Sequence, residues 1–491
     1  MTTKTTLRRL TAGMGALALA VAGVIALAVP ASAAVGPDQP DAPKTGTLTI
    51  NKYSGAPTDN PDPANLLDGV EFTVTQVGRV VGSACTPIDL AVAADWAGLS
   101  GPSGLFASAP AAPASPFCLT TTKQVKATSA GQAIFDLNVG VYYVQETNPG
   151  PNSIVSPVPP FYVSIPTSEG ADGNGWNYNV VADPKNQLME KPTKTIDEDQ
   201  AELVVGSEVE WTITVPIPTL NNDETFNSAI ITDSLDSRLT LVPGSSVVTI
   251  DGASTSNFDV TGNAVWTFNA AGRSELNDAM GKNLTITFKT KVNSVGDGTI
   301  PNDAYSSSFN GTTVPGEVVP YTYWGQLSIL KVDDSRPTAL KLEGATFVVF
   351  PSADGRCEAA APRTGTPTAT GTSDADGVVQ WAGVTPTNVL GLWIANVDDG
   401  PADPTPTKVY CVYETVAPAG HTLVPAGHPV TIKAGEAEIN ELTVVNTKKD
   451  GPNLPLTGGT MSVVLPIAGL LIVGGGVAAL VISRRRRHTE V

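Results

Sequence analysis

Histidine is scarce in this sequence, which has three among 491 residues. His421 and His428 lie in the body of the chain, and neither accompanies a nucleophile signature. A G-x-S-x-G motif, a P-loop and a G-x-G-x-x-G after a strand are all missing. These absences argue against an enzyme acting on an external substrate, so we expect a non-enzymatic protein and rank a surface hydrolase low.

Metal-binding patterns are missing as well. The four cysteines form no C-x-x-C and have no Cys/His metal spacing. Acidic clusters such as residues 197–199 (DED) lack the regular spacing of a calcium loop. We therefore expect no metal and no cofactor, and interpret these clusters as solvated surface.

Basic residues are also few, with 29 Lys and Arg against 47 Asp and Glu. The first 34 residues and the tail after Thr457 hold seven of the basic residues and one acidic residue. The remainder has 22 basic and 46 acidic residues, a net charge of −24. Such a surface disfavours nucleic acid and anionic lipid as partners.

The N-terminus has the features of a secretory signal peptide over residues 1–34. Lys4, Arg8 and Arg9 form a positive region, residues 12–29 are apolar, and residues 31–33 (ASA) fit a cleavage site. An uncleaved membrane anchor is the alternative. Small residues and Pro30 end the apolar stretch where cleavage is expected, so we predict export.

The C-terminal segment, residues 451–491, has three parts in order. The first is an LPLTG motif, which consists of Leu454, Pro455, Leu456, Thr457 and Gly458. The uncharged residues 461–483 follow and are long enough to span a bilayer, and four arginines at 484–487 come next. A tail-anchored protein with a chance LPLTG is the alternative.

This arrangement resembles a sortase sorting signal. The resemblance implies cleavage between Thr457 and Gly458, transfer of the Thr457 carbonyl to an amine, and attachment to peptidoglycan of the cell wall. The transmembrane span would then be temporary.

The four cysteines fall two and two into distant regions. An oxidising compartment outside the cell favours the disulfide pairs Cys85–Cys118 and Cys357–Cys411. Reduced structural cysteines are the alternative.

Strand signals dominate the chain between its two ends. Short alternating runs rich in Val, Ile, Thr and Tyr, such as residues 48–52, 70–74, 209–215 and 284–288, are broken by Gly, Pro, Asn and Asp. Helical periodicity is limited to two short candidates, residues 91–99 and 273–280. The pattern predicts an all-β fold of β-sandwiches in series.

An internal repeat divides the chain. Residues 46–52, 67–74 and 141–147 parallel residues 325–331, 342–349 and 409–415, whereas the segment between them lacks the pattern. We therefore predict a first and a third domain of one sandwich type, and a different β-domain between them. The predicted domains are 35–186, 187–321 and 322–450.

A crosslinking chemistry fits the third domain. Lys331 lies in its first strand and Asn446 in its last, and Glu414 lies in the motif of residues 410–420 (YCVYETVAPAG). Among apolar side chains the lysine loses its charge and the glutamic acid keeps its proton. The neutral amine can then attack the Asn carboxamide while the acid shuttles protons and ammonia leaves. Unrelated polar residues at strand ends are the alternative.

These motifs resemble the sortase-assembled shaft pilins of Gram-positive actinobacteria, fimbrial subunits with three immunoglobulin-like domains of the Cna type. The Glu414 motif resembles their E box, although His421 stands where an aromatic residue is usual. The resemblance implies an intramolecular isopeptide bond between Lys331 and Asn446. It implies a second bond in the middle domain, Lys194–Asn302, assisted by Asp233, for which Lys191 is a competing donor.

Residues 176–185 (WNYNVVADPK) resemble the pilin motif W-x-x-x-V-x-V-Y-P-K. Trp176, Val180, Pro184 and Lys185 match, whereas Ala182 and Asp183 depart from it. The resemblance implies that Lys185 is the amine that attacks the Thr457 acyl-enzyme of another subunit. A surface turn is the alternative, because Asp-Pro-Lys-Asn is a good turn sequence.

A third crosslink is less defined. Lys52 aligns with Lys331 and Glu146 with Glu414, and Asn186, directly after the pilin lysine, is the candidate acceptor. Some members of the family have this bond and others lack it.

We therefore expect a structural subunit of a covalently polymerised pilus, anchored to the cell wall and used in adhesion. Sortase, identical subunits, minor tip or base pilins and a host or bacterial receptor are its expected partners. The alternatives are a monomeric wall-anchored adhesin and a minor base or tip subunit.

Overall fold

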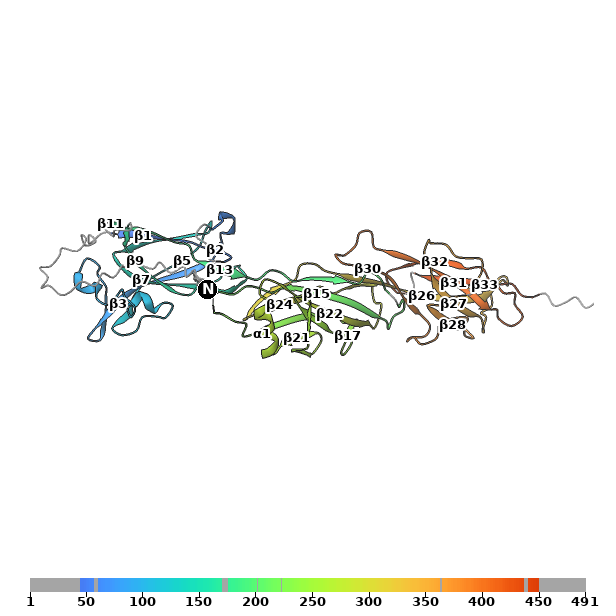
Figure 1. Ribbon diagram of the computed structural model, residues 1–491. Helices are drawn as coiled ribbons and strands as arrows, with labels where there is room; N and C mark the ends of the chain where they lie inside the picture. Colours follow the sequence, from blue (N-terminus) through green and yellow to red (C-terminus); the bar gives the residue numbers. More distant parts are fainter. Residues whose placement is uncertain are drawn as a thin grey trace, which may run out of the picture. The chain divides into compact units, whose positions relative to one another are not determined.

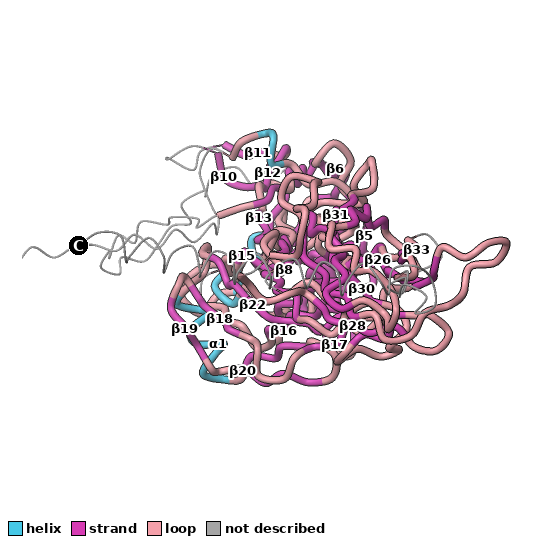
Figure 2. Tube along the Cα trace, turned by 90° about the vertical axis from the view of Figure 1, so that its right-hand side faces the viewer, coloured by secondary structure: helices cyan, strands magenta, loops and turns pink. Residues whose placement is uncertain are grey.

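The computed structural model describes residues 45–56, 61–169, 175–200, 202–221, 223–362, 364–436 and 440–449. Strands and loops make up nearly all of this part of the chain (Figures 1 and 2), which confirms the all-β prediction. One α-helix is described, α1 (Ala270–Asp278), and the side chain of Asn269 caps it by accepting from the N–H groups of Ala271 and Gly272. The helix predicted at 91–99 is only a short 3-10 turn, Ala93–Trp96.

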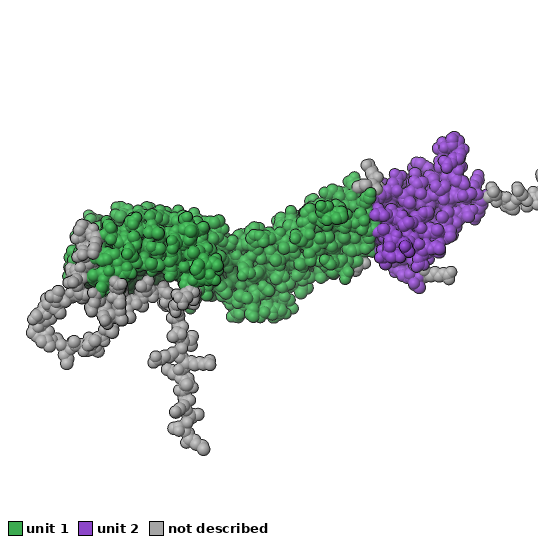
Figure 3. Space-filling model, turned by 90° about the horizontal axis from the view of Figure 1, so that it is seen from above, with its two compact units in different colours: residues 1–326, 391–408, 432–439 green, residues 327–390, 409–431, 440–491 purple. Residues whose placement is uncertain are grey.

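The chain divides into two compact units (Figure 3). Unit 1 comprises residues 1–326, 391–408 and 432–439, and unit 2 comprises 327–390, 409–431 and 440–491. Unit 1 therefore holds both the first and the middle predicted domain, and the division into three domains stays a prediction. Residues 391–408 belong to unit 1 through backbone pairing, for example Val205 N–H to Gly391 O at 3.0 Å.

The N-terminal part of unit 1 is a sandwich of two sheets with a small third sheet. The sheet orders are β12-β1-β6, β4-β3-β7-β9 with β5 also on β3, and β2-β13-β8. The strands are β1 (Thr45–Asn51), β2 (Tyr53–Ser54), β3 (Glu71–Val81), β4 (Ala84–Pro87), β5 (Phe117–Ala127), β6 (Gln132–Asn138), β7 (Gly140–Asn148), β8 (Ile154–Ser156), β9 (Phe161–Ile165), β12 (Asn179–Ala182) and β13 (Lys185–Leu188), and the hairpin β10 (Thr167–Glu169) and β11 (Gly175–Asn177) lies apart. The first strand β1 runs parallel to β12, near the end of this part of the chain.

The middle part of unit 1 also has two main sheets, ordered β14-β15-β22-β18-β19 with β17 on β22, and β20-β21-β16-β24-β25. The strands are β14 (Thr193–Ile196), β15 (Glu208–Pro216), β16 (Ala229–Ser234), β17 (Leu239–Leu241), β18 (Val247–Ile250), β19 (Ala253–Thr255), β20 (Phe258–Thr261), β21 (Val265–Phe268), β22 (Asn283–Val292), β23 (Thr299–Pro301), β24 (Ala304–Phe309) and β25 (Thr312–Pro315).

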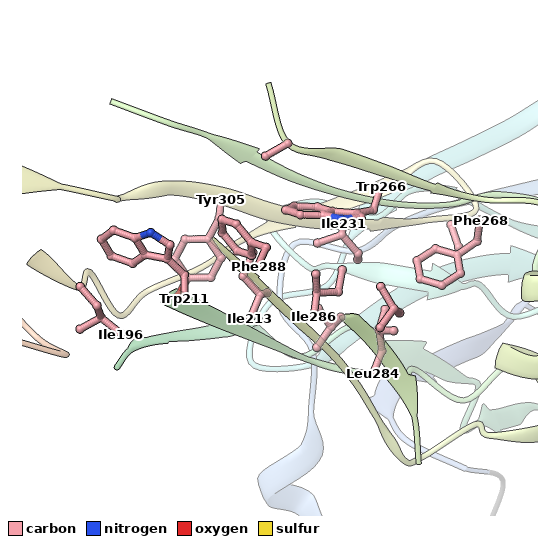
Figure 4. Close-up of a cluster of buried hydrophobic side chains, with 14 of the residues drawn as sticks. Ile196, Trp211, Ile213, Ile231, Trp266, Phe268, Leu284, Ile286, Phe288 and Tyr305 are labelled. Atoms are coloured by element: carbon pink, nitrogen blue, oxygen red, sulfur yellow. The ribbon is translucent and has the colours of Figure 1, made fainter. Parts of the chain in front are cut away.

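The alternation of apolar and polar residues along the sequence explains why these segments form strands with one buried face. Along β15 every second side chain is fully buried, namely Val209, Trp211, Ile213 and Val215. They meet the inward side chains of the neighbouring strands in one core (Figure 4). Because the side-chain period of a strand is two, this pattern fixes which face of the sheet is the core face.

Unit 2 repeats elements of the first part of the chain. Its main sheet is ordered β29-β28-β27-β31-β32, and β33 runs parallel to β26 from Ser328 to Asp333. The strands that lie wholly or largely in unit 2 are β26 (Tyr321–Asp333), β27 (Thr346–Pro351), β28 (Ala369–Ser373), β29 (Val379–Trp381), β31 (Thr407–Val416), β32 (His428–Lys433) and β33 (Glu441–Asn446). Strand β30 (Leu390–Val397) belongs to unit 1 from Gly391 onward. Phe347 on β27 lies opposite Glu414 on the neighbouring strand β31, and Phe72 on β3 lies opposite Glu146 on β7 in the same way. The predicted repeat therefore has the same strand pairing in both copies.

No helix in the described residues is long and apolar enough to cross a membrane. The predicted signal peptide, the span predicted at 461–483 and the Arg tail all lie outside the described residues. The same holds for the five residues of the predicted sortase motif, Leu454, Pro455, Leu456, Thr457 and Gly458.

Replacing Phe288 by Ala should lower the free energy of unfolding by about 3–5 kcal/mol, because the change leaves a cavity in the core. Phe288 is fully buried, opposite Trp211 on β15 and with its ring 5.0 Å from that of Trp266. Denaturant unfolding followed by tryptophan fluorescence measures the loss. Val260→Ala is the control, because that side chain is 41% exposed. An equal effect of the two changes would contradict the packing described.

Candidate functional site

Among the described residues, three lysine side chains are completely removed from solvent: Lys52, Lys194 and Lys331. A lysine is almost never fully buried unless it is paired. Each of these lysines lies near a carboxyl group and an asparagine carboxamide. The structure thus brings together all three residue sets that the sequence singled out.

In the N-terminal part of unit 1 the set is Lys52, Glu146 and Asn186. Lys52 lies between β1 and β2, Glu146 on β7 and Asn186 on β13. The lysine Nζ is 3.0 Å from Glu146 Oε2 and donates to Asn186 Oδ1. Asn186 Nδ2 donates to both oxygens of Glu146, at 2.8 and 2.9 Å. The carboxyl group therefore bridges the amine and the leaving nitrogen of the amide.

In the middle part of unit 1 the set is Lys194, Asp233 and Asn302. Lys194 Nζ lies 2.7 Å from Asp233 Oδ1, and Asn302 Nδ2 donates to Asp233 Oδ2 at 3.0 Å. Lys194 also donates to the backbone carbonyl of Asn302 at 3.1 Å, and its Nζ is 4.5 Å from the ring centroid of Tyr305. All three members of the set are fully buried.

In unit 2 the set is Lys331, Glu414 and Asn446, from β26, β31 and the end of β33. Asn446 Nδ2 donates to both oxygens of Glu414, at 2.8 and 2.9 Å. Lys331 Nζ is 4.0 Å from Glu414 Oε1 and donates to the backbone carbonyl of Val444 at 2.9 Å. The hydrogen bonds of the amide nitrogen repeat those of the Lys52 set, but here the lysine Nζ also donates to the Val332 carbonyl at 3.2 Å, and the amine is held by backbone carbonyls.

Burial controls the electrostatics of these sets. Loss of hydration lowers the pKa of Lys52, Lys194 and Lys331 to about 8, although the nearby carboxyl group opposes the shift in each case. Loss of hydration also raises the pKa of Asp233, against the opposing effect of Lys194. The two pKa values in the middle set move toward each other, which lowers the cost of moving the proton from the amine to the acid.

This arrangement supports an amide exchange. A neutral lysine amine is a nucleophile, whereas the ammonium is not. The carboxyl group accepts a hydrogen bond from the amide nitrogen that would leave as ammonia, so it is placed to deliver a proton there. The product is an amide between two side chains.

The candidate polymerisation lysine, Lys185, opens β13 directly beside Asn186. Successive strand residues point to opposite faces. Asn186 is accordingly fully buried, whereas Lys185 is half-buried and its Nζ donates to the Asp183 carbonyl at 3.0 Å. The competing donor Lys191 is 51% exposed and pairs with Glu317, away from the Lys194 set.

The other residues of the pilin-like motif lie along the preceding strands. Val180 on β12 is buried and pairs with Leu48 of β1, and Pro184 is buried. Trp176 lies on β11, with its ring 5.5 Å from that of Trp96.

Two disulfides link the cysteines in the pairs expected. Cys85–Cys118 joins β4 to β5, with the Cα atoms 6.0 Å apart, and Cys357–Cys411 ties residue 357 to β31, with the Cα atoms 5.5 Å apart. The described residues contain no group of three or more metal-ligating side chains.

Comparison with known proteins gives these sites a context. A model of the LPXTG cell wall anchor motif matches residues 446–490. Fimbrial subunit type 2 of Actinomyces naeslundii is 28% identical, covering 99% of this chain and 98% of that protein. Fimbrial subunit type 1 of Actinomyces viscosus is 27% identical, covering 97% of this chain and 98% of that protein. This chain is a homologue of actinobacterial fimbrial subunits.

A solved structure supports the same relationship for this fimbrial subunit. The full-length major pilin SpaD of Corynebacterium diphtheriae has a TM-score of 0.59 and 26% identity, covering 83% of this chain and 98% of that one. The chain is thus a homologue of structural, non-enzymatic fimbrial subunits, and it carries a cell wall anchor motif. The family and its LPXTG anchor imply sortase as a partner and self-polymerisation.

Sequence reasoning missed the groups that surround the three amines. The carbonyl of Val444, which accepts from Lys331, and the N–H of Val158, which donates to Asn186 Oδ1 at 2.7 Å, are backbone groups without a residue signature. The ring of Tyr305 beside Lys194 lies outside every motif considered. Only the strand pairing brings these groups to the amines.

The Lys194–Asn302 crosslink should form more slowly as the pH rises past about 8, the pKa of Lys194. The reactive state is a neutral Lys194 amine beside a protonated Asp233, and this pair holds one proton. Above this pH the pair loses that proton, so Asp233 can no longer protonate the leaving nitrogen. Intact-mass time courses on freshly synthesised chains, taken on both sides of this pH, measure the rate. A rate that keeps rising toward 10.5, the ordinary lysine value, would contradict the shared-proton arrangement.

Proposed function

We propose that this fimbrial subunit is polymerised head to tail by sortase through Lys185 and Thr457. The Lys185 amine attacks the acyl-enzyme formed at Thr457 of another copy, and an amide bond joins the two subunits. The observation that carries this proposal is the position of Lys185. It is the half-buried neighbour of a fully buried Asn186, and the hydrogen bond of its Nζ goes to a backbone carbonyl, not to an acid. Its amine is therefore open to the enzyme.

Repetition of this joint gives an open filament, because a head-to-tail contact that does not close on itself continues indefinitely. Most copies would be attached to a sister subunit, and the basal copy to peptidoglycan. Minor tip or base pilins and a host or bacterial receptor complete the proposed set of partners, and adhesion is the proposed use of the filament.

The proposal includes three intramolecular isopeptide bonds, Lys52–Asn186, Lys194–Asn302 and Lys331–Asn446. Their assisting acids are Glu146, Asp233 and Glu414. Each bond would join strands that lie far apart in the sequence, over separations of 134, 108 and 115 residues. Pulling force would then pass through covalent bonds, and the strands between the linked residues would not need to unfold.

Replacing Lys185 by Arg should abolish the high-mass ladder of wall extracts on a denaturing gel. The guanidinium keeps the positive charge but stays protonated, so it is no nucleophile. Lys191→Arg is the matched control, since Lys191 is an exposed lysine six residues away, and its ladder should be unchanged. A persistent ladder in Lys185→Arg would overturn the joint, and a wild type without any ladder would favour the monomeric wall-anchored adhesin.

Each assisting acid should be required for its own crosslink. In the exported chain, Glu146→Ala, Asp233→Ala and Glu414→Ala should each raise the intact mass by one retained ammonia, apart from the mass of the substitution itself. The reason is that the leaving amide nitrogen loses its proton donor. Glu317→Ala, at an exposed acid, is the control. A wild-type chain that retains all three ammonia equivalents would refute the crosslinks altogether.

A further inference from the structure

The carboxamide oxygen of Asn186 receives a hydrogen bond that the other two candidate acceptors lack. The backbone N–H of Val158 donates to Asn186 Oδ1 at 2.7 Å. A backbone N–H can only donate, so this contact assigns the oxygen and nitrogen of the amide. The nitrogen then faces Glu146, at 2.8 and 2.9 Å from the two carboxyl oxygens.

The equivalent oxygens of Asn302 and Asn446 are buried and have no hydrogen-bond partner in the described part of the protein. All three amides direct their nitrogen at the assisting acid. Asn186 Oδ1 thus accepts from the Val158 N–H as well as from Lys52 Nζ, and these two hydrogen bonds distinguish the Lys52 set from the other two.

Several contacts hold Val158 in place. It follows β8, which pairs with β13, the strand that carries Asn186. The Val158 side chain packs against the core of the N-terminal part of the chain. Ser156, two residues earlier, is fully buried and accepts from Asn221 N–H at 3.1 Å. The N–H is thus fixed before any reaction begins.

We propose that the Val158 N–H is an oxyanion donor for the Lys52–Asn186 crosslink. The Lys52 lone pair attacks Asn186 Cγ, and the π electrons of the carbonyl move onto Oδ1, where the N–H stabilises the negative charge. The carbonyl then re-forms, and the C–Nδ2 bond breaks. The amine loses one proton and the leaving nitrogen gains one, both through Glu146, so that ammonia departs and an amide remains.

This inference rests on the proposed Lys52–Asn186 bond. The N–H already lies within the distance range at which donors stabilise an oxyanion, roughly 2.7–3.1 Å. The negative charge grows at Oδ1 in the transition state, so the hydrogen bond strengthens there and accelerates the reaction. Loss of a single such donor from an enzyme slows the chemical step by about 10²- to 10³-fold.

The test replaces the Val158 amide by an ester, through incorporation of the α-hydroxy analogue of valine into the full exported chain. The ester keeps the side chain and the backbone shape but has no N–H. Val158→Pro is a second variant that also lacks the N–H, and Pro157 and Pro159 already favour an extended backbone there. Val158→Ala keeps the N–H and is the matched control. Time-resolved peptide mapping after synthesis gives the rate of each of the three crosslinks separately.

The ester chain should form Lys52–Asn186 about 10²- to 10³-fold more slowly than wild type. Lys194–Asn302 and Lys331–Asn446 should form at their usual rates in the same molecules, which also shows that the rest of the chain has folded. Val158→Ala should match wild type. Wild-type rates at all three sites in the ester chain would overturn the oxyanion assignment and leave the crosslinks intact. A wild-type chain without the Lys52–Asn186 bond would instead refute the proposed function at this site, and the inference with it.

Discussion

Burial of a lysine amine is the constraint on which the rest of this structure depends. Removing an ammonium group from water costs several kcal/mol even after the surroundings relax. Three lysines are buried in this way, Lys52, Lys194 and Lys331. A carboxyl group lies near each amine and offsets part of the cost of burial. Burial therefore destabilises the charged form that resists reaction. Conversion of amine and amide into a neutral crosslink would remove the buried charge altogether.

The strand β13 places the residues of the two proposed reactions side by side. Asn186 points into the core and Lys185 to the other face, because strand side chains alternate. A register shift of one residue would exchange the two. The parallel pairing of β13 with β2 sets Lys185 against Tyr53 and Asn186 against Ser54, which fixes the register next to Lys52.

Much of this organisation was predictable from local patterns. Alternating apolar residues indicated the strands, and the repeat around Glu146 and Glu414 indicated which acids share a position. The prediction of a helix at 91–99 was wrong in extent. The apolar periodicity of this segment was too short to outweigh turn formation around Ala93–Trp96. Membership of residues 391–408 in unit 1 was also unforeseen, since backbone pairing such as that of Val205 with Gly391 leaves no mark on the sequence. The contact of the Val158 N–H was not predictable either, because it too is made by a backbone group.

The position of the Lys52 set beside Lys185 has a mechanical consequence for the proposed filament. Force from a neighbouring subunit would enter the chain at Lys185, and Asn186 is the next residue along β13. An amide between Asn186 and Lys52 would pass that force within one residue to Lys52, which directly follows β1. Hydrogen bonds between β13 and its neighbours would then carry little of the load. The crosslink nearest to the joint is thus the one on which the joint's strength most depends, and its carboxamide is the one held by an additional backbone donor.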